Sequence, residues 1–284
     1  MAKDSAIEWT HHTFNPWWGC TKVSPGCKHC YAETWARRIG QTLWGPRAPR
    51  RQLSDAYWQQ PLSWNAEAQR IGKRRRVFCA SMADVFEDRR DLDANRERLW
   101  RLIADTPNLD WLLLTKRPHK VRELAPYGDD WPNNVWLGAT AENQKWLDRR
   151  MAELSELKAK ILFLSCEPLL GPLDFANWIA EAQSGRRRLV HWVIAGGESG
   201  HHARAPNPQW FRSIRDQCVA AGIKFHFKQW GNWRPILPRQ VNGYKSKALF
   251  LSTGEKIIVA NVGKKKAGRR LDGRTWDEFP ALGS

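Results

Sequence analysis

The stretch Trp111-Leu-Leu-Leu-Thr-Lys116 is a short apolar run that ends in polar residues. A continuous apolar run of this length is typical of a strand in a parallel sheet covered on both faces. Six further runs predict strands, and most of them lead through a polar loop into a helix-like segment. They lie near 14–18 and at 76–84, 135–140, 161–165, 189–195 and 223–227, the second of them running into a loop.

Strands that alternate with helices at intervals of roughly thirty residues indicate repeated βαβ units. The apolar spacing predicts helices at 54–70, 91–103, 143–157 and 208–221. We therefore expect an α/β fold, a partial or near-complete parallel β/α barrel of the TIM type. An open doubly wound sheet would produce the same alternation.

The polar residues at the ends of the predicted strands favour the barrel. In β/α barrels the carboxyl ends of the strands build the active site, although polar strand-to-helix loops also supply ordinary helix caps. Six such ends carry candidate groups: Ser81 and Asp84, Thr115 and Lys116, Thr140 and Glu142, Ser165 and Glu167, Glu198 and Ser199, and Lys228 and Gln229.

The pattern predicts two parts of the chain. Residues 1–230 form the barrel, with a cysteine loop near the N-terminus and an insertion at 41–75. Residues 231–284 form a small basic appendage that contains β-structure and packs on the barrel. Within it, residues 248–260 read as a hairpin that turns at Thr253-Gly254.

The charge is strongly one-sided, with 46 Lys and Arg against 29 Asp and Glu and a net charge of +17. Four basic clusters at 70–76, 116–120, 186–188 and 264–270 favour a nucleic acid, DNA or RNA, as partner. An acidic protein partner would satisfy the same charge. The candidate phosphate-binding residues are Arg74, Arg75, Arg76, Lys116, Arg117, Lys264, Lys265, Lys266, Arg269 and Arg270.

The composition also bears on the compartment. There is no run of eighteen apolar residues and no apolar signal segment at the N-terminus, so we expect a cytoplasmic protein without membrane spans. The six cysteines are then expected to be reduced. Most of the 18 tryptophans are expected in the core, and a few near the cysteine loop or the basic runs could stack on bases.

Three thiols occur within eleven residues of the segment Gly19-Cys-Thr-Lys-Val-Ser-Pro-Gly-Cys-Lys-His-Cys-Tyr31. Closely spaced thiolates suit zinc or an iron–sulfur cluster. A structural zinc site normally has four ligands, whereas Cys20, Cys27 and Cys30 suit a [4Fe-4S] cluster whose fourth iron stays open. Zinc remains the alternative, and His11 and His12 are possible additional ligands for it.

The cysteine loop resembles that of the radical S-adenosylmethionine enzymes, in which three cysteines bind a [4Fe-4S] cluster. The spacing here is C-x6-C-x2-C, longer in its first gap than the usual C-x3-C-x2-C of those enzymes. More closely, and nearly end to end, the chain resembles a phage-associated family of three-Cys-motif proteins. The second resemblance rests on Phe14-Asn-Pro-Trp-Trp-Gly-Cys20, Gly196-Gly-Glu-Ser-Gly200, Phe227-Lys-Gln-Trp-Gly231 and 271–280.

The resemblance implies S-adenosylmethionine as a cofactor. In radical S-adenosylmethionine enzymes a Gly-Gly-Glu segment after the second strand binds the amino group of the cofactor. Here Ser81-Met-Ala-Asp84 holds that position, and Gly196-Gly-Glu198 comes much later. The candidate cofactor-binding residues are Ser81, Asp84, Glu142, Glu167, Gly196, Gly197 and Glu198.

Three functions remain open at this point. The first is a radical S-adenosylmethionine-type enzyme that acts on or with nucleic acid. The second is a non-catalytic nucleic-acid-binding or partner-binding protein with a structural metal, and the third is a zinc-dependent hydrolase or nuclease. The sequence contains no phosphate loop, catalytic triad or HExxH motif.

Overall fold

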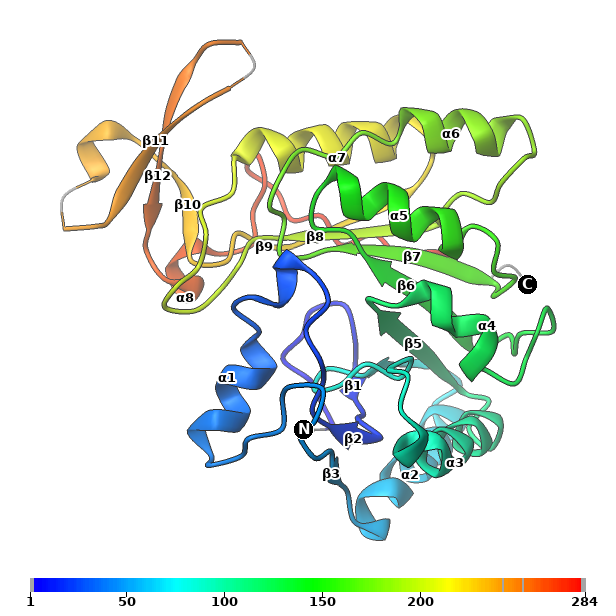
Figure 1. Cartoon of the computed structure of the whole chain (residues 1–284). Coiled ribbons are helices and arrows are strands. Elements are labelled where there is room, and N and C mark those ends of the chain that lie inside the picture. The colour runs from blue at the N-terminus through cyan, green and yellow to red at the C-terminus, as the bar shows by residue number, and fades with distance from the viewer. Residues whose placement is uncertain (1–2, 242, 252, 282–284) are drawn as a thin grey trace. The chain divides into compact units, whose positions relative to one another are not determined.

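The computed structural model describes residues 3–241, 243–251 and 253–281. The chain has a mixed α/β fold in which seven strands follow one another in the order β1-β4-β5-β6-β7-β8-β9, consistent with a partial β/α barrel (Figure 1). Two smaller sheets, β10-β12-β11 and β2-β3, complete the β-structure of the described residues.

The chain forms two compact units. Unit 1 comprises residues 1–139 and 150–163, and unit 2 comprises 140–149 and 164–284. The division expected at residue 230 lies within unit 2, between β9 and β10, and stays a prediction. In the part of the chain that the structure describes, no helix is both long and apolar enough to cross a membrane.

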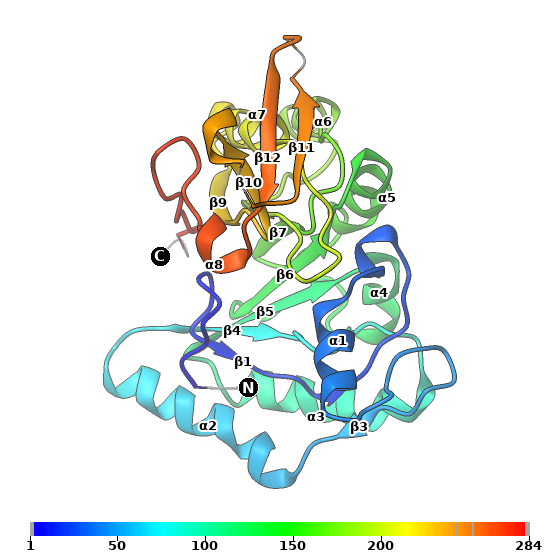
Figure 2. The ribbon, with the colours of Figure 1, turned by 90° about the vertical axis from the view of Figure 1, so that its left-hand side faces the viewer.

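Unit 1 contains parallel strands with helices beside them. Trp111 to Thr115 of β5 pairs with β6, and Arg75 to Cys79 of β4 pairs with β5. Helix α2 contacts β4 and β5 and lies beside β4 in Figure 2. The strands of unit 1 are β1 (His12–Thr13), β2 (Trp17–Trp18), β3 (Arg51–Gln52), β4 (Arg75–Cys79), β5 (Leu109–Thr115) and most of β6 (Val135–Thr140).

The α-helices of unit 1 are α1 (Tyr31–Arg38), α2 (Asp55–Arg70), α3 (Asp93–Ala104) and α4 (Val121–Leu124). Helix α2 begins where the sequence predicts, because the Ser54 side chain caps it by accepting a hydrogen bond from the Tyr57 backbone N–H. The predicted helix at 91–103 is a short 3-10 turn, Arg90–Leu92, followed by α3.

The first predicted strand is displaced from its expected position. Residues 14–18 are not one strand of the parallel sheet, because β1 is His12–Thr13 and pairs with β4. Phe14 still donates a backbone hydrogen bond to Phe78, but Pro16 has no N–H to continue such a ladder. The chain turns there, and β2 pairs with β3 instead.

Aromatic side chains fill much of the core of unit 1. Phe14 stacks on Tyr57 and meets the rings of Trp58 and Trp111 edge-on. The expectation that most tryptophans are core residues is confirmed, because twelve of the 18 are buried. They are Trp9, Trp17, Trp18, Trp58, Trp64, Trp100, Trp111, Trp131, Trp136, Trp192, Trp230 and Trp233.

Unit 2 contains parallel strands packed against helices and a separate antiparallel sheet. Helix α7 contacts β8 and β9, which pair in parallel. Its strands are the end of β7 (Ile161–Cys166), β8 (Trp192–Gly196), β9 (Lys224–Gln229), β10 (Trp233–Ile236), β11 (Ser246–Phe250) and β12 (Lys256–Asn261). Helix α5 (Gln144–Leu154) is divided between the units, and unit 2 also holds α6 (Ala176–Gln183), α7 (Pro208–Ala220) and α8 (Lys264–Ala267).

The predicted C-terminal hairpin is confirmed. β11 and β12 pair antiparallel, with Phe250 opposite Lys256 at the end of the ladder that lies next to the turn. β10 pairs with the other edge of β12, so the appendage is a three-stranded sheet.

Candidate metal centre

The cysteine loop is anchored where it leaves β2. Gly19 has a positive φ of 110°, and its N–H donates to the Met82 carbonyl at 3.0 Å. A Cβ atom at Gly19 would lie 2.5 Å from the Leu43 carbonyl oxygen, so no other residue fits without movement. The next residue, Cys20, forms a β-bridge with Trp44. The start of the loop is therefore fixed by the backbone of the insertion at 41–75.

The Cys20 thiol faces a buried cation. Its Sγ lies 3.7 Å from Nη1 of Arg117, which comes from the loop after β5. Burial raises the pKa of Cys20 to about 12; the Asp84 charge adds to this rise and Arg117 opposes it. As a free thiol Cys20 is therefore protonated at neutral pH, and a metal would have to displace its proton.

The other two thiols of the loop lie at the end of a short 3-10 helix and at the start of α1. Cys27 ends the short 3-10 helix Pro25–Cys27, and its Sγ lies 3.8 Å from the Ser24 hydroxyl oxygen. Cys30 occupies the N-cap of α1. Burial raises the pKa of Cys30, while the backbone N–H groups of Glu33 and Ala32 and the Lys116 charge oppose the rise. The amino end of α1 therefore favours negative charge on this sulfur.

The remaining cysteines have a different environment. Cys79, Cys166 and Cys218 are fully buried in β4, β7 and α7. Burial raises the pKa of each of them, and no hydrogen-bond donor to their sulfurs is found among the described residues. They are therefore core thiols, including Cys166, which the sequence placed beside Glu167 at a strand end.

The three loop thiols fit an iron–sulfur cluster by their chemistry, because thiolate sulfur is the ligand that such clusters use. Their arrangement is open. Among the described residues, no three His, Cys, Asp or Glu side chains are gathered into a group that would hold a metal ion as it stands. Binding would thus require the sulfurs of Cys20, Cys27 and Cys30 to approach one another.

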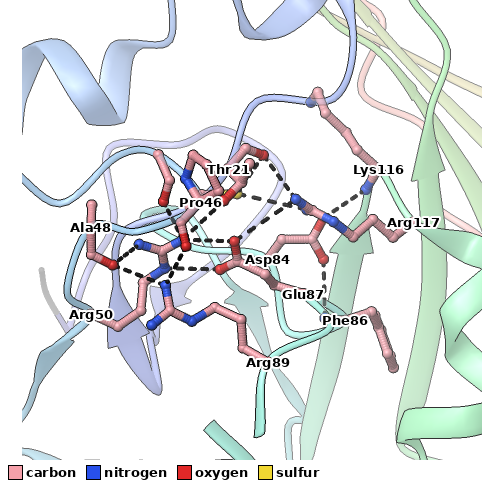
Figure 3. A network of polar contacts seen from close by, with 12 residues as sticks. Thr21, Pro46, Ala48, Arg50, Asp84, Phe86, Glu87, Arg89, Lys116 and Arg117 are labelled. Carbon is pink, nitrogen blue, oxygen red and sulfur yellow. Dashed lines mark hydrogen bonds and ion pairs between the residues drawn. The ribbon is translucent and has the colours of Figure 1, made fainter. Parts of the chain in front are cut away.

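A buried network of ion pairs and hydrogen bonds contacts the start of the cysteine loop (Figure 3). Nη1 of Arg117 donates to Asp84 Oδ2 at 2.8 Å, and its Nη2 donates to the Thr21 carbonyl at 2.8 Å. Arg50 makes a two-pronged pair with Glu87 at 2.9 and 2.7 Å, and also donates to the Thr21 hydroxyl at 3.1 Å. Both arginines therefore hold the residue that follows Cys20.

Asp84 is the centre of this network rather than an open ligand. It is 5% exposed, and beyond Arg117 it accepts hydrogen bonds from the Thr115 hydroxyl and from the Lys116 and Phe86 backbone N–H groups. Ser81, the other predicted cofactor residue of unit 1, is hydrogen-bonded to the Asn15 side chain. The prediction that either residue binds a cofactor stays a prediction.

In unit 2 the structure brings three of the predicted groups together. Glu167 follows β7 and forms an ion pair with Lys228 of β9, whose Nζ donates to Glu167 Oε2 at 3.1 Å. A Cβ atom at Gly196 of β8 would lie 2.3 Å from Glu167 Oε1, so the glycine leaves room for this carboxylate. A Cβ atom at Gly197 would likewise lie 2.0 Å from the Trp230 carbonyl oxygen, so this position also has no room for a side chain.

The other two acidic candidates of unit 2 are more enclosed. Glu142 is fully buried, and its Oε1 lies 3.4 Å from the Thr140 hydroxyl. Glu198 forms an ion pair with Arg204, whose Nε and backbone N–H both donate to its Oε2 at 2.8 Å. Only Glu167 therefore combines a partly exposed carboxylate with a neighbouring ammonium group.

The basic clusters differ in their exposure and in whether their charges are paired with carboxylates. Arg74 pairs with Asp110 at 2.7 Å, and Arg75 and Arg76 are half-buried residues of β4 rather than a run in solvent. Arg117 is buried with Asp84. Lys264 to Lys266 are exposed on α8, and Arg269 pairs with Asp277. Contacts of these residues with phosphate stay a prediction.

Sequence reasoning missed Arg50 and Glu87, the second buried pair of the network. Arg50 lies in the insertion at 41–75, ahead of the predicted helix at 54–70, in a stretch where no periodicity singles out a residue. Its partner is 37 positions away along the chain, so no local pattern signals the pair.

Fold and site together define a mixed α/β protein of the partial-barrel kind with a three-cysteine loop near its N-terminus. The chain belongs to the family described as "Protein of unknown function (DUF5131)", which matches residues 4–280. No curated protein and no solved structure matches the chain.

Proposed function

We propose that the chain is an iron–sulfur protein in which Cys20, Cys27 and Cys30 hold a [4Fe-4S] cluster. The observation that carries the proposal is the difference between the two sets of cysteines. Each thiol of the loop lies next to a group that stabilises negative charge on sulfur: a guanidinium, a hydroxyl, or the amino end of a helix. Such outer partners are typical of metal-ligating residues.

The buried Arg117 supports the proposal through its charge. A cubane cluster with three thiolate ligands is anionic, and burying it requires nearby positive charge or hydrogen-bond donors. Arg117 already lies against the Cys20 sulfur and is held in place by Asp84. It would therefore place a positive charge beside the cluster.

We further propose S-adenosylmethionine as the cofactor of an enzyme of the radical type built on a TIM-like barrel, acting on or with nucleic acid. The bound cluster would supply the electron that cleaves this cofactor. Glu167 and Lys228 support the assignment, because their ion pair could be exchanged for the ammonium and carboxylate groups of the methionine moiety. Asp84, Glu142 and Glu198 remain the other candidates.

The cluster is tested by anaerobic reconstitution with iron and sulfide, followed by visible absorption. Replacing any one of Cys20, Cys27 or Cys30 with Ala should abolish the brown colour. Cys218→Ala is the matched control, because it removes a buried thiol without such a donor and should keep the colour. Equal colour in all four variants would overturn the proposal.

The cofactor is tested by adding S-adenosylmethionine to the reduced protein and recording its electron paramagnetic resonance spectrum. Gly196→Ala should weaken the spectral change, because the new methyl group displaces the flexible end of Glu167 from Lys228. Gly200→Ala is the control, since a Cβ there meets no atom within 4 Å. A cluster whose spectrum ignores the cofactor in the unaltered chain would leave the alternative of a non-catalytic protein with a structural metal.

A further inference from the structure

The segment from Trp233 to Arg270 concentrates the positive charge of the chain. It holds ten lysines and arginines against one acidic residue, Glu255, a net of +9 out of +17. The segment contains the β10-β12-β11 sheet and α8. More than half of the net charge of the protein is thus carried by this one segment, and six of its basic residues lie in the sheet and α8 themselves.

One face of this sheet is used for packing. Trp233 and Val259 form a buried cluster with Ala203, and Leu249 packs against it. The Trp233 indole donates to the Ala203 carbonyl at 2.7 Å. The Asn207 side chain donates to the Phe250 carbonyl at 3.1 Å, which ties the hairpin to the start of α7. The hairpin is therefore anchored to the rest of unit 2 by this packing and by this hydrogen bond.

The part of the opposite face that lies next to the hairpin turn is exposed. Residues that pair across antiparallel strands share a face, and neighbours along a strand alternate. Because Leu249 faces the packed side, Phe250 and its partner Lys256 lie on the other side, as does the pair of Ala248 and Ile258. Phe250 is 65% exposed, the highest value among the large exposed apolar side chains. The exposed part of this face thus presents the Phe250 ring beside the Lys256 ammonium group.

The lysines of this segment lack acidic partners. Among the residues that the structure describes, no carboxylate lies within ion-pair distance of Lys256, Lys264, Lys265 or Lys266. Lys266 instead lies 5.7 Å above the ring of Tyr244. Arg74 and Arg117 of the other clusters are paired with carboxylates. The free lysine charges are therefore the ones placed to bind an external polyanion.

We propose that the β10-β12-β11 sheet and α8 form a binding surface for a single-stranded nucleic acid segment. The lysines contact its phosphates, and Phe250 stacks on an unpaired base. An exposed aromatic ring on a sheet, with a lysine opposite it on the neighbouring strand, can stack on an unpaired base and contact phosphate without reading the sequence. The inference rests on the proposed function for its partner class and is independent of the cluster. In both ribbon views β11 and β12 project away from β8 and β9 (Figures 1 and 2).

The test is the fluorescence anisotropy of a labelled twenty-nucleotide single strand, titrated with the full chain at several salt concentrations. With about five phosphates engaged, the log–log slope of affinity against salt should be about −3.5. Replacing Lys264, Lys265 and Lys266 together with Gln should make the slope shallower by about 2. A matched control with Lys145, Lys158 and Lys224 replaced by Gln removes the same charge outside the four basic clusters and should keep the slope.

Phe250→Ala should weaken binding by about 5- to 150-fold and leave the salt slope unchanged. Phe250→Trp keeps an aromatic ring and should retain the affinity. Equal slopes in both lysine triple variants, or binding indifferent to salt, would overturn the proposal, and the surface would then fit an acidic protein. Iron is measured on the same preparations, so colourless protein that binds with the expected slope would contradict the cluster and support this surface.

Discussion

Breaking the buried pair of Arg117 and Asp84 should destabilise unit 1 far more than breaking an ion pair of the same chemistry at the surface. Asp84 and Arg117 are 5% and 7% exposed, and their closest N–O distance is 2.8 Å. Arg117→Met leaves a carboxylate buried without its cation. Removing one partner of a buried pair costs about 3–5 kcal/mol, so a loss of this size is expected.

The matched control is the pair of Arg98 and Asp55. Its N–O distance is 2.7 Å, but the side chains are 41% and 86% exposed. A surface pair of this kind is worth about 0–1 kcal/mol. The two pairs therefore join the same residue types at nearly the same distance and differ mainly in burial.

The assay is equilibrium urea unfolding followed by tryptophan fluorescence, with a double-mutant cycle for each pair. Arg117→Met, Asp84→Asn and their combination give one coupling energy, and Arg98→Met, Asp55→Asn and their combination give the other. We expect at least about 2 kcal/mol of coupling for the buried pair and below about 1 kcal/mol for the exposed pair. Equal coupling energies in the two cycles would refute the reasoning.

Three further changes test other parts of unit 1. Burial, followed by the nearby Arg76 charge, lowers the pKa of His11 from 6.5 to about 4, and its Nδ1 accepts the Arg76 backbone N–H. His11 should therefore make stability fall by about 1–2 kcal/mol as the pH drops from 6.5 to 4, after allowance for partial exposure. His11→Gln should make this slope shallower in urea titrations, and His12, whose pKa burial also lowers, contributes to the slope that remains. Gly138→Ala places a methyl group 2.4 Å from the Phe163 ring and should cost at least about 1–3 kcal/mol, checked by thermal unfolding; an unchanged melting temperature would contradict the packing. Arg50→Lys keeps the charge but loses the two-pronged pair with Glu87, and should cost about 1.5–3 kcal/mol in the same assay; a variant as stable as the natural chain would contradict that role.

The strands were predictable from the sequence where an apolar run stands between polar loops. β6 occupies the predicted residues 135–140, and β5 and β7 differ by two residues or fewer at each end. The first strand was misplaced because the run from Phe14 to Trp18 is apolar throughout, and apolarity alone does not show which neighbour each strand pairs with. Pro16 was the available signal that this run does not form one strand.

The candidate site was predictable only in its local part. Cys20, Cys27 and Cys30 stand out because three thiols and two glycines fall in one short loop. The network beneath them joins residues 33 and 37 positions apart, and such pairings follow from the tertiary fold rather than from any local spacing. For the same reason Asp84 looked like an open strand-end ligand, whereas the structure surrounds it with donors.

The metal content of the chain tests the central claim most directly. The measurement is iron, acid-labile sulfide and zinc per chain in anaerobically purified and reconstituted protein, together with X-ray absorption at the metal edge. The cluster predicts about four iron and four sulfide per chain. One zinc per chain with sulfur ligands at about 2.3 Å, and no sulfide, would contradict it.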